Sequence, residues 1–372
     1  MKFKNAAAVG AIALASALAL AGCSGTGTGG STPSATKTTA AVDYSSLSGT
    51  ITSGGSSAQK NVQQAWSAAF KAQASNVTIN YDSTQGSGGG VTNWLNGSYD
   101  FAGSDAALNP DQWTQAQTAC TGGGLNIPVY LSGVSIIFKL DGVSKLNLDA
   151  KTIASIFAGK ITKWNDPAIA ALNSGVTLPA TAISVVHRSD GSGTTNNFTT
   201  YLNQQEPSIW TWPANTAWPN NVGSGQQGGS GVVNAVEAGN GTIGYADQSS
   251  IGNATQAAVE VGSTGTFVDY SAAAATESLD ESGVLAPQGD GDLTVKIDTT
   301  KITNTSAYPI PLLSYAVLCK TFKDPAQAKL TTAYLGFIVS KTGQEVGAKN
   351  AGAAPLPDSF QTKAAATLAT VK

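Results

Sequence analysis

The chain has 372 residues, of which 41% are hydrophobic and 12% are charged, and its net charge at pH 7 is −3. This composition is typical of a globular protein that is long enough to form two lobes. The chain has no basic stripe and no arginine cluster, which excludes nucleic-acid binding as its main function.

The first residues predict export from the cytoplasm. Lys2 and Lys4 precede an apolar segment at 6–20 that is too short to span a membrane and is typical of a secretory signal peptide. The segment ends in "LAGC", which resembles a bacterial lipobox and implies removal of residues 1–22 and lipidation of the Cys23 thiol, for example with palmitate. An ordinary signal peptide with an incidental cysteine is the alternative. We therefore expect an extracytoplasmic lipoprotein, held at the cell membrane by Cys23 and a flexible Gly/Ser/Thr-rich linker over 23–47.

Two further cysteines, Cys120 and Cys319, are far apart in the sequence. In an oxidising compartment an even pair favours a disulfide, and two buried free thiols are the alternative. One histidine and two distant cysteines supply no cluster with metal-ligand spacing, so we expect no metal and no cofactor.

From residue 49 onward, strand-like and helix-like segments alternate. The first helix is indicated by apolar residues at i, i+3, i+4, i+7 and i+8 within 57–74. Strands are expected at 49–55, 77–81, 99–105, 127–140 and 182–190, and helices at 57–74, 86–97, 148–160 and 194–204. The alternation predicts an α/β fold with mainly parallel sheets.

Four Gly/Ser/Thr-rich or acidic stretches follow expected strands, and each leads into a turn or a helix start. They are "GGSSA" (54–58), "GSGGG" (86–90), "GSD" (103–105) and "RSDGSGTT" (188–195). Ligands of parallel α/β sheets bind at the carboxyl ends of strands, where glycines let backbone N–H groups approach and helix dipoles favour anions. Each stretch alone is more often a simple turn, but together they predict a site for a small tetrahedral oxyanion.

Arg188 is the only arginine of the chain and would supply the site's one full positive charge. Asp190 lies two residues further on, on the same side of an extended segment, and can hold the guanidinium. His187, the only histidine, alternates with Arg188 along the strand and therefore faces away, as a structural residue. Asp105 has two interpretations. It caps a loop, or it accepts the proton that phosphate retains and fully ionised sulfate lacks.

Taken together, "GSGGGV", "DFAGSDAAL", "FAGKITKWNDPAIAALN" and "RSDGSGTT" resemble the periplasmic phosphate-binding proteins of bacterial ABC phosphate importers (PstS type), in the same order over about residues 49–360. The resemblance implies a two-lobed Venus-flytrap fold with discontinuous domains. Lobe I would comprise 48–132 and 309–372, and lobe II would comprise 133–308.

The matching motifs imply which residues of this sequence correspond to the family's binding residues. Asp105 would be the acceptor of the phosphate proton, and Asp190 would be the partner of the guanidinium. "Ser57-Ala58" departs from the Thr-Phe that family members often have, although both residues can donate N–H groups. One residue is inserted before "GSGGGV", which affects the register of Ser87. The implied phosphate-binding residues are Ser57, Ala58, Ser87, Asp105, Arg188, Ser192, Gly193 and Thr194.

The resemblance implies a monomeric receptor that binds inorganic phosphate and delivers it to ABC permease subunits. We expect no enzyme, because no catalytic base or metal cluster accompanies the serines. The alternatives are a receptor for sulfate or molybdate, a secreted phosphatase with Ser57, Ser87 or Ser192 as nucleophile, and an adhesion or signalling protein that kept the fold. Three tryptophans at 210–218 are expected to pack in lobe II, with a sugar platform as the alternative.

Overall fold

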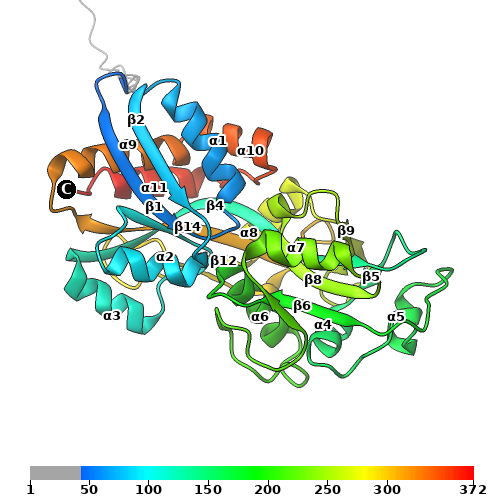
Figure 1. Ribbon diagram of the computed structural model, residues 1–372. Helices are drawn as coiled ribbons and strands as arrows, with labels where there is room; N and C mark the ends of the chain where they lie inside the picture. Colours follow the sequence, from blue (N-terminus) through cyan, green and yellow to red (C-terminus); the bar gives the residue numbers. More distant parts are fainter. Residues whose placement is uncertain (1–42) are drawn as a thin grey trace, which may run out of the picture. The chain divides into compact units, whose positions relative to one another are not determined.

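The computed structural model describes residues 43–372 (Figure 1). The signal segment and Cys23 lie outside the described residues. The folded part begins slightly earlier than the expected residue 48, because the Tyr44 ring packs edge-on against Phe70 at a centroid distance of 4.9 Å. In the part of the chain that the structure describes, none of the helices has the length and apolar character needed to cross a bilayer.

Alternating strands and helices form the N-terminal part of the fold. They are β1 (Ser48–Gly55), α1 (Lys60–Lys71), β2 (Asn76–Asp82), α2 (Gly86–Leu95), β3 (Phe101–Ser104), α3 (Pro110–Ala119) and β4 (Thr121–Lys139). Strand β1 pairs in parallel with both β2 and β3, as alternating β/α segments predict. Helix α1 buries Val62, Trp66 and Phe70, which confirms the face expected from the sequence.

The central part of the chain contains shorter strands. Its elements are β5 (Asn147–Leu148), α4 (Ala150–Phe157), α5 (Pro167–Leu172), β6 (Ser184–Arg188), α6 (Gly193–Gln205), β7 (Ser224–Gln226), α7 (Gly228–Ala238), β8 (Thr242–Asp247), η1 (Gln248–Ser250), β9 (Thr255–Gln256), β10 (Ala258–Glu260) and β11 (Phe267–Val268). Strand β6 pairs in parallel with β7 and β8, and the α7 valines pack against Ile137 and Val186.

The remaining elements return to the N-terminal part of the molecule. They are α8 (Ala272–Ser282), β12 (Gly283–Leu285), β13 (Val295–Ile297), η2 (Thr299–Lys301), β14 (Pro311–Thr321), α9 (Pro325–Val339), α10 (Lys341–Ala351) and α11 (Asp358–Leu368). Figure 1 shows the orange and red helices α9 to α11 beside the blue β1 and β2. Helix α1 is tied to this group because the Trp66 indole donates to the Gly343 carbonyl at 2.7 Å.

Strand β4 joins the two groups of strands. The main sheet has the order β2-β1-β3-β14-β4-β8-β6-β7, and β9 also pairs with β4. Strand β4 pairs with β14 up to Gly133, opposite Pro311, and with β8 from Val134 onward, opposite Asp247. Both pairings are antiparallel, so the sheet is mixed rather than mainly parallel. We call the β1, β2, β3 and β14 side lobe I and the β8, β6 and β7 side lobe II.

The segment from α8 to η2, which precedes β14 in the sequence, packs on both lobes. Ala275 and Leu279 of α8 lie in the same apolar cluster as Val91 and Trp94 of α2, in lobe I. Gln204 of α6, in lobe II, donates to the carbonyl of residue 297 at 3.0 Å. The predicted lobe limits at 132/133 and 308/309 remain a prediction.

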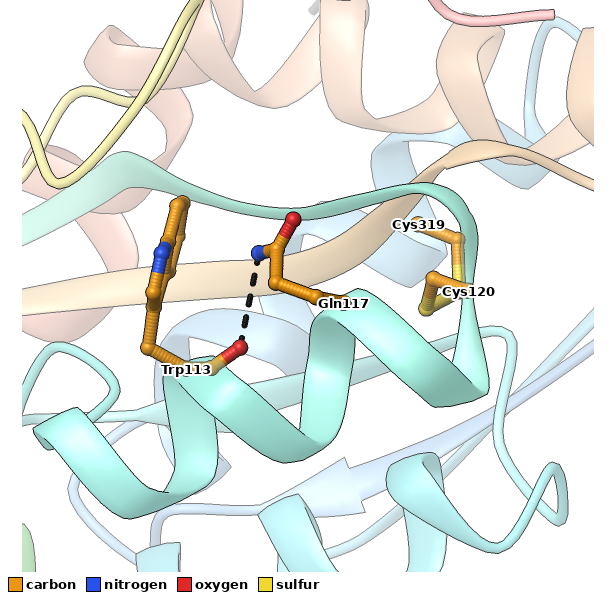
Figure 2. Close-up of a disulfide and its surroundings, with 4 residues drawn as sticks. All are labelled: Trp113, Gln117, Cys120 and Cys319. Atoms are coloured by element: carbon orange, nitrogen blue, oxygen red, sulfur yellow. Dashed lines mark hydrogen bonds between the residues drawn. A yellow bond between two sulfur atoms is a disulfide. The ribbon is translucent and has the colours of Figure 1, made fainter.

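A disulfide joins Cys120, at the end of α3, to Cys319 of β14 (Figure 2). The two Cα atoms are 5.3 Å apart, and the cysteines are separated by 199 residues in the sequence. The Gln117 side chain lies beside the disulfide on α3, where its amide donates to the Trp113 carbonyl at 3.4 Å. The cross-link fixes the start of β4 to the end of β14 within lobe I.

Candidate anion-binding site

Glycines at the ends of β1 and α2 let backbone segments approach each other closely. Gly55 ends β1 with a φ of +129°, a conformation that favours glycine. A Cβ at Gly90 of α2 would lie 2.9 Å from the Gly54 carbonyl oxygen. The N-terminal turn of α2 is thereby pressed against the carboxyl end of β1, where the sequence predicts ligand binding.

Asp105 follows β3 and is 2% exposed, at the centre of a hydrogen-bonded group. Its Oδ1 accepts from the hydroxyls of Ser56 at 2.5 Å and Ser314 at 2.7 Å, and its Oδ2 accepts from the Thr194 hydroxyl at 3.1 Å. The Asp105 amide donates to the Ser87 hydroxyl at 3.2 Å. Thr194 belongs to lobe II, so this carboxylate joins the two walls of the cleft.

Arg188 ends β6 and is also 2% exposed. Its Nε donates to one oxygen of Asp190 at 2.7 Å, and its Nη2 donates to the other oxygen in the same bidentate pair. Asp190 Oδ1 also accepts from the Gly228 amide at the start of α7, at 3.1 Å. The guanidinium is therefore fixed in one orientation, as such planar pairs are.

The first turn of α2 and the loop that precedes α6 touch across the cleft. The Gly88 amide donates to the Gly191 carbonyl at 2.8 Å. A Cβ at Gly193 would lie 2.7 Å from both the Asp105 Cβ and the Ser87 Oγ, so only glycine fits there. This contact and the Asp105–Thr194 bond show that the lobes are closed on each other.

Four helix starts gather at this point, those of α1, α2, α6 and α7. The Ser57 hydroxyl, just before α1, accepts from the Gly229 amide in the first turn of α7 at 3.1 Å. The first amides of a helix have no intrahelical acceptor, and the helix dipole is positive at this end. Helix N-termini that gather in this way form a site suited to an anion.

The structure brings all eight predicted binding residues to this place, but four of their backbone amides already donate within the protein. They are the amides of Ala58, Asp105, Arg188 and Ser192, and the Arg188 amide donates to the Tyr245 hydroxyl at 3.3 Å. The Ala58 amide donates to the Ser56 hydroxyl at 3.1 Å in this closed geometry. Its predicted contact with a ligand stays a prediction. The Ser192 amide donates to the Thr216 carbonyl at 2.9 Å, and its Oγ caps α6 by accepting from Thr195 at 3.1 Å. The hydroxyl proton of Ser192 remains free to donate.

Sequence reasoning missed two residues that hold Asp105, namely Ser56 and Ser314. Ser56 lies inside the "GGSSA" stretch, but the family motif assigned a binding role only to the next two residues, Ser57 and Ala58. Ser314 is a polar residue in the apolar strand "PLLSYAVL" and is fully buried. A buried hydroxyl needs a partner, so an isolated serine in such a strand is a usable signal.

The two aspartates of the site have pKa shifts of opposite direction. Burial raises the pKa of Asp105, against the lowering effect of its hydroxyl donors and of Arg188. Burial also raises the pKa of Asp190, but the bonded Arg188 outweighs this effect and the net pKa is lowered. Asp190 is thus the firmly ionised partner, and Asp105 is the carboxylate that lacks a bonded cation.

The residues outside the cleft have packing roles. The His187 ring stacks on Trp218 at a centroid distance of 4.8 Å, and its Nδ1 lies 2.9 Å from the Arg188 carbonyl oxygen. Trp210 packs against Trp212 and Trp218, which confirms the packing prediction for this loop. Over residues 43–372, no group of three or more potential metal ligands is present.

Comparison with known proteins first defines the class of protein. Residues 30–342 match the PBP superfamily domain. The chain shares its fold with a high affinity periplasmic phosphate-binding protein (PfluDING) bound with phosphate, at a TM-score of 0.67 and 22% identity over 86% of this chain and 93% of that chain. A phosphate binding protein from Stenotrophomonas maltophilia gives a TM-score of 0.65 and 21% identity over 86% and 94% of the two chains.

Sequence relatives narrow the class. The chain is 35% identical over 375 residues to Phosphate-binding protein PstS2 of Mycobacterium bovis (strain BCG / Pasteur 1173P2), which covers 99% of each chain. It is 33% identical over 319 residues to Phosphate-binding protein PstS 3 of Mycobacterium leprae, over 84% of this chain and 85% of the relative. The chain belongs to the PstS-type phosphate-binding proteins. The family resemblance and the two-lobed α/β fold expected from the sequence are thereby confirmed.

Proposed function

We propose that this protein is an extracytoplasmic receptor that closes around one inorganic phosphate and delivers it to an ABC import permease. The phosphate-binding names of its full-length relatives and the phosphate bound in a protein of the same fold support the ligand. The gathered helix starts, the fixed guanidinium and the Asp105 carboxylate would be the groups that bind it.

The observation that carries the proposal is the pattern of bonds at Asp105. A carboxylate has about four lone-pair positions, and three of them accept from Ser56, Ser314 and Thr194. The remaining position is on Oδ2, which accepts only from Thr194. A protonated oxygen of phosphate can donate to it, whereas fully ionised sulfate has no proton to offer.

The charges of the side chains at the site also favour phosphate as the ligand. Arg188 is neutralised by Asp190, and Asp105 adds a negative charge that no bonded cation balances. A fully ionised anion would be repelled by this carboxylate, so the guest must carry a proton and must be held mainly by N–H and O–H dipoles. Phosphate near neutral pH meets both requirements.

The proposal includes no chemical step. His187, the only histidine, contacts the Arg188 carbonyl and Trp218, so it is not placed as a base for Ser57, Ser87 or Ser192. The purified protein should therefore leave a chromogenic phosphomonoester unhydrolysed. Release of the chromophore that is lost in Ser57→Ala or Ser192→Ala would favour a phosphatase.

Membrane anchoring is proposed from "LAGC" and the family. The protein expressed in a bacterial host should fractionate with membranes and carry a lipid on Cys23 by mass spectrometry, and Cys23→Ala should be released. Equal release of both forms would contradict the anchor while leaving phosphate binding untouched.

Isothermal titration of the purified, phosphate-depleted protein with phosphate and with sulfate tests the central proposal. We expect one phosphate per chain and no competition from sulfate in excess. Equal affinity for the two anions, or no binding of phosphate, would overturn the function proposed here.

A further inference from the structure

Two hydrogen bonds from side-chain amides cross the cleft beside the anion site, and their arrangements match. The Ser249 hydroxyl also crosses, to the Ala58 carbonyl at 3.3 Å. Asn61, the second residue of α1 in lobe I, donates its side-chain amide to the Ser249 carbonyl in lobe II at 2.6 Å. Gln227, just before α7 in lobe II, donates its side-chain amide to the Thr84 carbonyl in lobe I at 2.8 Å. Each lobe thus supplies one amide and one carbonyl, so the arrangement is reciprocal.

Both acceptor carbonyls belong to turns with the sequence Asp-x-Ser/Thr. In "DST", Asp82 accepts from the amide of Thr84 at 2.9 Å and from its hydroxyl at 2.6 Å. In "DQS", Asp247 accepts from the amide of Ser249 at 2.9 Å and from its hydroxyl at 2.6 Å. Such aspartate-capped turns fix the direction of the backbone, so each carbonyl is held ready for an amide from the other lobe.

The two bonds lie close to the site without being part of it. Asn61 follows Ala58 by three residues, and Gln227 precedes Gly228, whose amide binds Asp190. Neither amide bonds to a predicted phosphate-binding residue. The bonds form only when the lobes meet, and in an open form both amides and both carbonyls would be hydrated.

We infer that these two reciprocal amide-to-carbonyl bonds are latches that set the population of the closed form and thereby the phosphate affinity. The inference rests on the proposed function. The apparent affinity of a ligand that needs the closed form scales with the fraction of the protein that can close. A contact made only in the closed form therefore strengthens binding without touching the anion.

The first test measures phosphate affinity by titration for Asn61→Ala, Gln227→Ala and the double variant. We expect about 3–10-fold weaker binding for Asn61→Ala, as is typical for loss of one hydrogen bond. The effect of Gln227→Ala should be smaller, because its bond is solvent-exposed. The double variant should show the product of the two factors, because the two bonds share no partner residue.

A second test replaces the donor by an acceptor of the same shape. Asn61→Asp places a carboxylate oxygen against the Ser249 carbonyl and should weaken binding more than Asn61→Ala. The matched control is Gln73, exposed just beyond the C-terminal end of the same helix, whose amide bonds only within its own segment. Gln73→Ala and Gln73→Glu should bind phosphate as the wild type does.

The readouts separate a latch from a merely structural role. Stopped-flow kinetics should show the change mainly as faster phosphate release, and thermal unfolding without phosphate should be unchanged. Small-angle scattering should require more phosphate to reach the compact form. The inference is overturned if the wild type binds phosphate and the Asn61 and Gln227 variants bind within about twofold of it, or if the Gln73 controls lose as much. Absence of phosphate binding by the wild type would instead overturn the proposed function.

Discussion

Asp105 and Asp190 occupy facing walls of one cleft, both largely out of contact with water, yet their surroundings differ. Asp190 meets a bidentate guanidinium, and its pKa is lowered although burial alone would raise it. Asp105 meets three neutral hydroxyls, and its pKa is raised by burial. The comparison shows that a full opposite charge offsets desolvation, whereas hydroxyl dipoles offset only part of it.

The difference gives the two carboxylates different tasks. Asp190 has a structural role, because it orients the Arg188 guanidinium and the start of α7. Asp105 accepts from three hydroxyls and keeps one lone-pair position, which in the function proposed above would accept the proton of the phosphate. Four substitutions test this difference between buried carboxylates with and without a bonded cation.

Asp105→Asn should have the largest effect, on selectivity. An amide at this position can donate to an unprotonated oxygen, so the preference for phosphate over sulfate should fall by about 10³-fold or more. The wild type should lose phosphate affinity on acidification at a pH above the usual aspartate range, since its raised pKa removes the acceptor early. The asparagine variant should lack this pH dependence.

Competition titration of phosphate against sulfate from pH 4 to pH 8 measures both effects. Asp111→Asn, an exposed aspartate of the same lobe, is the control and should behave as the wild type. An unchanged preference in Asp105→Asn would contradict the assigned role.

Asp247→Asn tests a third buried aspartate, which also lacks a cation. Burial raises the pKa of Asp247 from 3.8 to about 6, despite hydroxyl donors. Because the folded pKa is the higher one, its contribution to stability is complete below the unfolded value and is lost as the pH rises through the folded value. The free energy of unfolding of the phosphate-free wild type should therefore lose about 2 kcal/mol between pH 4 and pH 8, a loss that the variant should not show.

Denaturant unfolding at several pH values checks this expectation. The informative quantity is the difference between the two proteins, because all other titrating groups are shared. Parallel pH profiles would show that Asp247 titrates normally.

Arg188→Lys keeps the charge and removes the planar fork. Lysine cannot donate to both Asp190 oxygens from Nε and Nη2 at once, so the cation loses its fixed position. We expect phosphate affinity to fall by about 30-fold, corresponding to about 2 kcal/mol, with little change in thermal stability at saturating phosphate. An affinity equal to that of the wild type would mean that charge alone is needed.

Ser314→Ala should have the smallest effect. It removes one hydroxyl donor from Asp105, so the pKa of Asp105 should rise further and the acid limb of phosphate binding should move to higher pH. The affinity at neutral pH should weaken about threefold. Titration at pH 5 and pH 8 checks this, and a shift of the acid limb to lower pH would contradict the interpretation of the hydroxyl as a stabiliser of the ionised form.

Local chemistry made much of the site predictable. Arg188 with Asp190, the glycine-rich helix starts and Asp105 are short motifs, and each places its groups through nearby backbone. The face of α1 followed from helical spacing for the same reason. The mixed sheet was not predictable in this way, since β4 and β14 run antiparallel through long-range pairing that no local pattern encodes.

Contacts between distant segments account for the other omissions. Ser314 reaches Asp105 across 209 positions of the chain, and Asn61 reaches Ser249 across 188. The engaged amide of Ala58 depends on the rotamer of Ser56, which the sequence does not specify. The roles of residues that act through such long-range contacts can be assigned only when the three-dimensional structure is known.

The covalent link between Cys120 and Cys319 makes a ring of the chain, and nearly all of lobe II lies inside it. A single proteolytic cut within that ring would open the backbone but leave one molecule, because the fragments stay attached through sulfur. A nicked chain would therefore migrate as one band until a reductant is added, and it would retain both walls of its cleft on one connected scaffold.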